Sequence, residues 1–310
     1  MAKLDGQLVK TVTSDGIELH GFLADSGSDT AVLHVHGTAG DFYTHEFLWM
    51  EAEMLAKMGI SFLTTNNRGH DVYTDLRKHE KNGKVAWETI GGAFERFEDC
   101  VLDIGAWIDF LEKQGAKRVI LQGHSLTHKL VYYQHAKKDP RVIGQIHLSP
   151  CNDAGYLNNT LGKERFAEAT SLIKKLVAEG RGKEMLPPHI AVVCPMGAMA
   201  GYGYLIEDGV GNLFPYHKPD SPNWSSLSKI REPLLVVFGG ADEFIRPSIA
   251  KQATLHDAAR IFKQKASSAA SVSTRVIEGS AHSYIGFEGE LVSTIRDWLR
   301  QTFPAKARSK

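Results

Sequence analysis

The stretch that decides the fold is Arg118-Val-Ile-Leu-Gln-Gly-His-Ser-Leu-Thr127, in which an apolar run ends in Gly123-His124-Ser125. Residues compatible with a helix follow at once. This order is typical of a strand that turns sharply into a helix, with a nucleophilic serine held above the sheet at the turn. We therefore interpret Ser125 as a catalytic nucleophile. The alternative is a serine that caps the helix expected at residues 126–137.

Two further residues follow predicted strands in the order that a serine, a carboxylate and a histidine would need to act together on such a sheet. Asp242 comes after one apolar run, and His282 comes after the next one. A serine hydroxyl needs a base within hydrogen-bond reach, and a buried carboxylate can fix the tautomer of that base. We expect His282 to be the base and Asp242 its carboxylate. Glu243 and Asp153 remain alternative acids, and His282 could instead be a surface histidine.

A glycine-flanked loop, His36-Gly37-Thr38-Ala39-Gly40, follows a predicted strand near the start of the chain. Flexible backbone at this position can point an amide N–H at a developing oxyanion. We expect the amides of Thr38 and Leu126 to form that pair, although an ordinary strand-to-helix turn is the alternative. His34 and His36 share one strand face, but no further ligands with metal-binding spacing follow, so we expect no metal site.

Apolar runs alternate with amphipathic segments along most of the chain, which predicts an α/β fold with a doubly wound, mostly parallel sheet. The strands are expected in a hairpin over 9–24 and at 31–36, 60–65, 119–122, 142–148, 234–238 and 273–277. The helices are expected at 46–58, 94–111, 126–137, 248–262 and 288–303.

The alternation breaks after the sixth sheet strand and resumes before the seventh. We therefore expect a core domain formed by residues 1–150 and 230–310, with residues 151–229 inserted as a cap or lid. The insertion contains one clear amphipathic helix and many aromatic and methionine side chains. Some of these residues are expected to line a substrate pocket, and the alternative is that they only pack the insertion on the core. The residues chosen for the pocket are Tyr156, Met199, Tyr202, Tyr204 and Trp224.

Composition excludes several classes of partner. The 310 residues include 36 Lys and Arg and 36 Asp and Glu, so the formal net charge is zero and nothing predicts binding to nucleic acid or to an anionic membrane. No apolar run is long enough to span a membrane, and the first residues lack the apolar core of a signal peptide. The three cysteines have no motif spacing, which favours the reduced cytoplasm. The basic residues 306–310 are expected to be a frayed terminus.

Ser125, Asp242, His282 and the loop at His36 together resemble the α/β-hydrolase superfamily over nearly the whole chain. A finer resemblance lies in Gly-His-Ser-Leu, in His128-Lys-Leu-Val-Tyr-Tyr133 and in Leu148-Ser-Pro-Cys-Asn-Asp153. These motifs resemble the branch that contains fungal siderophore esterases and their uncharacterised bacterial relatives. The resemblance implies an ester hydrolase that acts on a natural-product ester, of which a hydroxamate-type ester is one option.

One position departs from the superfamily motif G-x-S-x-G, because Thr127 stands where the second glycine is usual. A small residue is normally needed there since helix and strand approach closely. We expect a turn that is wider or shifted and still works, and the alternative is a damaged or repurposed site.

These observations predict a carboxylesterase-like serine hydrolase that needs no cofactor and takes a small-molecule ester as its partner. The alternatives are an acyltransferase or thioesterase, a carbon–carbon bond hydrolase, or a ligand-binding protein without activity on the same fold. The oligomeric state stays open, with a homodimer among the options.

Overall fold

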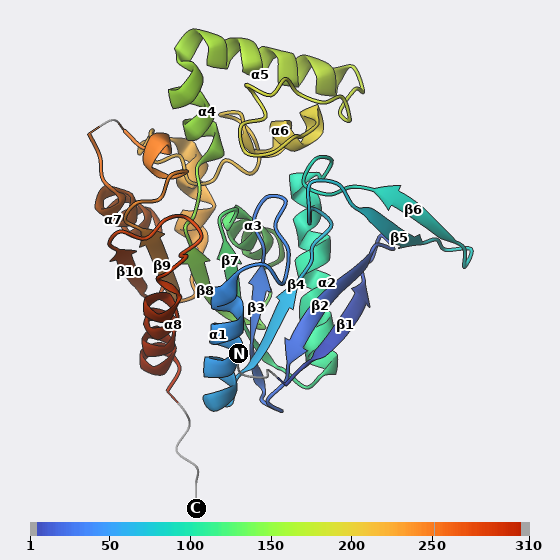
Figure 1. Ribbon diagram of the computed structural model, residues 1–310, viewed down its shortest axis with the longest axis vertical. Coiled ribbons are helices and arrows are strands. Elements are labelled where there is room, and N and C mark those ends of the chain that lie inside the picture. Colours follow the sequence, from blue (N-terminus) through green and yellow to red (C-terminus); the bar gives the residue numbers. More distant parts are fainter. Residues whose placement is uncertain (1–4, 251, 305–310) are drawn as a thin grey trace, which may run out of the picture.

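The computed structural model describes residues 5–250 and 252–304, and an eight-stranded sheet forms its centre (Figure 1). The spatial order of the strands is β1-β2-β4-β3-β7-β8-β9-β10. β2 is antiparallel to both of its neighbours, and the remaining pairs are parallel. The predicted mostly parallel sheet is therefore confirmed. Its strands are β1 (Gln7–Val12), β2 (Glu18–Ala24), β3 (Thr30–Val35), β4 (Ser61–Thr65), β7 (Arg118–His124), β8 (Val142–Leu148), β9 (Leu234–Gly239) and β10 (Val272–Ile277).

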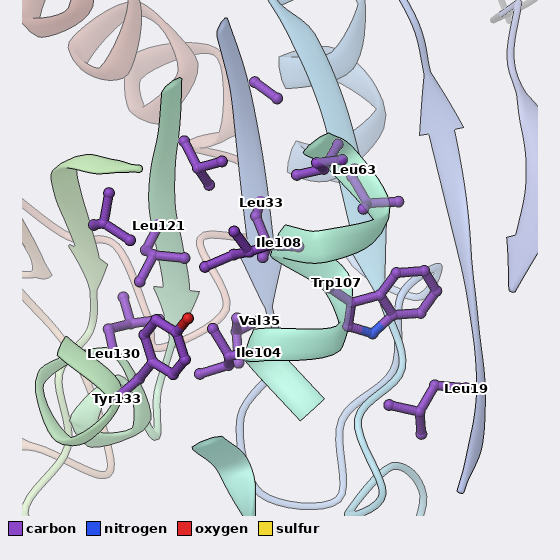
Figure 2. Packing of buried hydrophobic residues seen from close by; sticks show 14 of the residues in the cluster. Leu19, Leu33, Val35, Leu63, Ile104, Trp107, Ile108, Leu121, Leu130 and Tyr133 are labelled. Carbon is purple, nitrogen blue, oxygen red and sulfur yellow. The ribbon is translucent and has the colours of Figure 1, made fainter. Parts of the chain in front are cut away.

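Helices cover both faces of the sheet, which is why its central strands are buried along their whole length. One face packs against α1 (Glu46–Lys57) and α8 (Glu288–Thr302). The other face packs against α2 (Cys100–Lys113), α3 (His128–Lys137) and α7 (Leu255–Lys265). Figure 2 shows the second face, where Ile104 and Ile108 of α2 lie near Leu33 and Leu121 of the sheet. Trp107, in the same cluster, points to the other side of the helix, where Leu19 lies.

The segment between β8 and β9 folds into its own set of short elements above the carboxyl ends of the strands (Figure 1). It contains α4 (Asp153–Leu161), α5 (Lys163–Ala178), α6 (Ala198–Tyr204) and the short 3₁₀ helices Pro222–Ser225 and Leu227–Lys229. Its apolar side chains belong to two buried clusters. Those up to Ile206 pack with Phe97 and Leu126, and those from Leu213 onward pack with residues of α3, β9 and α7. The segment is thus packed directly over the serine turn.

The structure differs from the sequence prediction in several places. The helix expected at 248–262 begins at Leu255, because the side chain of Thr254 caps it there, and only the 3₁₀ turn Arg246–Ser248 precedes it. The helix expected from residue 94 begins at Cys100, because Arg96 has an extended backbone and only the 3₁₀ turn Phe97–Asp99 precedes α2. A hairpin of β5 (Asp75–His79) and β6 (Val85–Thr89) was not expected, since its largely exposed, charged strands lack an apolar face. The helices α4 and α6 were missed because both are short and contain glycine.

No helix among residues 5–250 and 252–304 is long and apolar enough to cross a membrane. The prediction of a frayed basic terminus falls on residues 305–310, outside the described part of the chain.

Three buried polar side chains form a cluster between α1 and the sheet. The amide Nε2 of Gln122 donates to Glu51 Oε2 at 2.8 Å and also lies 3.1 Å from Nδ1 of His34. All three side chains are buried, and burial raises the pKa of Glu51 from 4.5 to about 8. Glu51 is therefore mostly a neutral acid at neutral pH.

The raised pKa of Glu51 predicts a pH dependence of folding stability. The stability that the neutral Glu51 side chain contributes to the folded protein is fully present below pH 4.5, where Glu51 is protonated in both the folded and the unfolded chain. This stability is lost as the pH rises toward about 8. We expect the free energy of unfolding of Glu51→Gln, relative to that of the parent, to increase as the pH rises from 4.5 to about 8. Urea denaturation at several pH values measures this difference. The exposed Glu46→Gln on the same helix is the control. A difference between Glu51→Gln and parent that does not change with pH would contradict the assignment.

Candidate active site

Ser125 lies in a sharp turn between the end of β7 and the start of α3. Its φ is 65°, a left-handed value that costs free energy for a residue with a side chain. The turn is held on both sides, because the Ser125 amide donates to Leu148 O at 2.9 Å and the Cys151 amide donates to Ser125 O at 3.0 Å. The hydroxyl-bearing residue is thereby fixed at the carboxyl end of the central strands.

The loop after β3 presses directly against this turn. A Cβ placed on Gly37 would lie 2.8 Å from Cβ of Ser125 and 2.9 Å from the carbonyl oxygen of His124, so no other residue fits without a shift. His36 holds the loop in place: its Nδ1–H donates to Gly37 O at 2.7 Å, and its Nε2 accepts from the Asn67 amide at 2.9 Å. Burial lowers the pKa of His36 to about 3, so it stays neutral and keeps this tautomer.

The backbone amides of Thr38 and Leu126 have no hydrogen-bond partner within residues 5–250 and 252–304. Thr38 borders the same cavity as Ser125. The Leu126 amide lies near the loop as well, 3.4 Å from the position that a Cβ on Gly37 would take. Two unpaired donors beside the serine could bind an oxyanion.

The structure brings His282 and Asp242 together at the ends of the loops that follow β10 and β9. Nδ1 of His282 lies 2.8 Å from Oδ2 of Asp242, and Asp242 is fully buried. The other carboxylate oxygen of Asp242 accepts from the amides of Phe244 and Ile245 at 3.0 and 2.8 Å. Glu243, an alternative acid, instead accepts from the backbone amide of His282 at 3.0 Å.

Sequence reasoning missed the residues that hold the histidine loop. His124 Nε2–H donates to the carbonyl oxygen of His282 at 2.8 Å, and the Ser149 hydroxyl reaches the same oxygen at 3.3 Å. Ser149 also lies 2.9 Å from the hydroxyl of Tyr284, which donates to Val237 O at 2.9 Å. The only signal in the sequence was the position of His124 inside the serine motif, where a buried polar side chain must have a partner.

Ser125 and His282 line one cavity of about 230 Å³. Its wall is formed by His34, His36, Gly37, Thr38, Gly40, His45, His124, Ser125, Cys151, Asp153, Val193, Phe244, His282 and Ser283. No hydrogen bond joins the Ser125 hydroxyl to the His282 ring in the described structure. A larger hollow of about 970 Å³ runs along α5, but it touches none of Ser125, Asp242 and His282.

None of the five residues expected to bind substrate lines this cavity. Tyr204 and Trp224 are buried in apolar clusters, where their rings pack the insertion. Tyr202 is partly buried against the first of these clusters, and Met199 borders a separate groove beside Arg68. Tyr156 does not line the cavity, but the centroid of its ring lies 6.3 Å from that of Phe244, which does. Aromatic composition alone does not distinguish packing from lining.

Thr127 is accommodated by a buried hydrogen-bond chain. His147 Nε2–H donates to Gln145 Oε1 at 3.1 Å, so its Nδ1 is free to accept from the Thr127 hydroxyl at 2.9 Å. Burial lowers the pKa of His147 to about 3 and keeps the ring neutral. The methyl of Thr127 lies 3.4 Å from where a Cβ on Gly123 would be, so the absence of a side chain at Gly123 leaves room for it. The helix α3 begins only at His128, two residues later than predicted.

Comparison with solved structures finds esterases and α/β hydrolases. The siderophore hydrolase EstB of Aspergillus fumigatus is 17% identical over 97% of this chain and 99% of its own, with a TM-score of 0.63. The esterase Est1E of Butyrivibrio proteoclasticus, solved with ferulic acid bound, is 15% identical over 94% of this chain and 98% of its own, with a TM-score of 0.61. An esterase of Pyrococcus furiosus is 17% identical over 97% and 91%, with a TM-score of 0.60.

These likenesses show that the chain has the α/β-hydrolase fold, which the sequence motifs predicted. No curated protein matches the chain by sequence. A family model described as "Protein of unknown function (DUF1749)" matches residues 91–300, which include Ser125, Asp242 and His282.

The hydrogen bond of Thr127 predicts a stability effect that packing alone would not produce. Thr127→Val keeps the shape but leaves Nδ1 of the buried His147 without a donor, so we expect a loss of about 1–3 kcal/mol of unfolding free energy in urea. Thr127→Ser keeps the hydroxyl and should lose less. A Thr127→Val protein as stable as the parent would show that the hydrogen bond does not hold the turn.

Proposed function

This chain belongs to the DUF1749 family of proteins of unknown function, and we propose that it is a serine-dependent carboxylic ester hydrolase acting through an acyl-enzyme. The observation that carries the proposal is one small cavity that joins a serine in a left-handed turn to a histidine paired with a buried aspartate. This combination of roles is what nucleophilic ester cleavage requires.

In the proposed acylation step, Ser125 Oγ attacks the ester carbonyl while His282 Nε2 takes the hydroxyl proton. Asp242 holds the proton on Nδ1 of His282 and stabilises the imidazolium that forms. The amides of Thr38 and Leu126 donate to the tetrahedral oxyanion. When the intermediate collapses, His282 gives its proton to the leaving alkoxide, and the acyl group stays on Ser125.

In the proposed deacylation step, His282 removes a proton from water, and the resulting hydroxide attacks the acyl carbonyl. Collapse of the second intermediate returns the proton to Ser125 and releases the carboxylic acid. The contact between Ser125 and His282 belongs to the substrate complex in this scheme, because catalytic hydrogen bonds often tighten only when substrate binds. No cofactor is required, since backbone amides provide the charge stabilisation.

We further propose that residues 151–229 act as a cap over this site. Cys151, Asp153 and Val193, all from this segment, line the cavity together with residues of the core. A cavity of about 230 Å³ bordered on one side by this segment suits a small-molecule ester. We place the protein in the cytoplasm, because its cysteine pattern favours a reducing compartment.

The proposal predicts that Ser125→Ala abolishes hydrolysis of a panel of short and medium-chain nitrophenyl esters. Removing a nucleophile that acts with its base can lower turnover on the order of a millionfold. The exposed Ser171→Ala on α5 is the matched control and should keep the parent rate. Added alcohol or thiol acceptors distinguish hydrolysis from acyl transfer by their products. Retention of the parent rate in Ser125→Ala would reject the serine mechanism.

A further inference from the structure

Asp153 is a buried carboxylate that lines the catalytic cavity but has no place in the proposed triad. It is the first residue of α4 and only 9% exposed. The thiol of Cys151 donates to its Oδ2, with Sγ and Oδ2 3.1 Å apart. A thiol is a weak donor, so this contact compensates little of the cost of burying a carboxylate.

No protein cation pairs with Asp153 within residues 5–250 and 252–304. The buried lysine of the region, Lys129, is 2.8 Å from Glu95 and satisfies that carboxylate instead. Burial accordingly raises the pKa of Asp153. The N-terminus of α4 favours the charged form, which keeps the carboxylate available to a cation.

The rest of the cavity wall contains no lysine or arginine. Among the lining residues, Asp153 is the one aspartate, glutamate, lysine or arginine. Burial lowers the pKa of four of the five lining histidines, His34, His36, His45 and His124, so these rings are neutral at neutral pH. Asp153 therefore has no lysine or arginine partner in the cavity wall, and His282 is the one lining histidine that favours its charged form.

An aromatic ring lies on the same wall. Phe244 borders the cavity, and its ring centroid is 4.9 Å from that of His282 and 6.3 Å from that of Tyr156. Aromatic faces attract cations at partly exposed sites too, and Phe244 is 37% exposed. A carboxylate and an aromatic ring around one small cavity are a suitable environment for an ammonium group.

Resting on the proposed function, we infer that the preferred substrates are small esters that carry an ammonium group, which pairs with Asp153 while Ser125 attacks the carbonyl. The ammonium group could belong to the acyl part or to the alcohol part of the ester. Both options use the same chemistry, so the test has one arm for each.

The acyl arm compares β-alanine methyl ester with methyl butyrate, which replaces the ammonium by a methyl group. The alcohol arm compares butyrylcholine with its dimethylbutyl carbon isostere. Each kcat/KM is divided by the rate of hydroxide hydrolysis of the same ester, which removes the difference in intrinsic reactivity. A charge-assisted contact predicts a preference of about tenfold to a hundredfold for the cationic ester in at least one arm.

Asp153→Asn should remove that preference, because the amide has the same size and no charge. Asp220→Asn, an exposed residue of the same inserted segment, is the matched control and should keep it. Equal rates for both members of each pair in the parent protein, or a preference unchanged in Asp153→Asn, would overturn the inference.

A second measurement avoids any folding defect of the variant. Choline and dimethylbutanol are compared as competitive inhibitors of methyl butyrate hydrolysis by the parent protein. If the ammonium group belongs to the alcohol part of the substrate, choline should inhibit at a concentration about tenfold lower than dimethylbutanol. The comparison of β-alanine with butyrate as inhibitors tests the acyl part in the same way. Equal inhibition in both pairs would overturn the inference. Loss of methyl butyrate hydrolysis in Ser125→Ala tests the proposed function separately.

Discussion

The left-handed turn at Ser125 is the constraint on which the rest of the site depends. A serine with φ of 65° is stable only where the surroundings hold it, and here three segments do so. The carbonyl oxygen of Leu148, at the end of β8, accepts a hydrogen bond from the Ser125 amide, and the Cys151 amide donates to the Ser125 carbonyl oxygen. Gly37 lies against Cβ of Ser125. The sheet therefore fixes Ser125, the loop at Gly37 and the start of the inserted segment by the same contacts.

Hydrogen bonds between buried polar side chains stabilise this turn, where small residues or apolar packing are more usual. Thr127 stands where a glycine is usual, and the imidazole of His147 receives its hydroxyl. His124 donates to the carbonyl oxygen of His282, so the turn at Ser125 and the loop of His282 are linked through one side chain. Because buried polar groups are costly unless paired, these networks favour a single arrangement of the site.

Much of the architecture could be predicted because the central strands read as apolar runs followed by glycine-rich turns. The order of Ser125, Asp242 and His282 came from the same pattern. The choice between Asp242, Glu243 and Asp153 needed the structure, because all three acids follow strands and only geometry shows which one reaches Nδ1 of His282. The residues that line the cavity were not predictable from the sequence. An aromatic residue type does not tell whether its side chain packs in a cluster, as Trp224 does, or lines a cavity, as Phe244 does.

The central claim is that Ser125 is a nucleophile activated by the pair of His282 and Asp242. The most direct measurement is reaction of the folded protein with a fluorophosphonate, followed by mass spectrometry of the intact chain and its peptides. The account predicts one adduct on the peptide that contains Ser125, with labelling slowed strongly in His282→Ala. An unmodified protein, or an adduct on another residue, would contradict it.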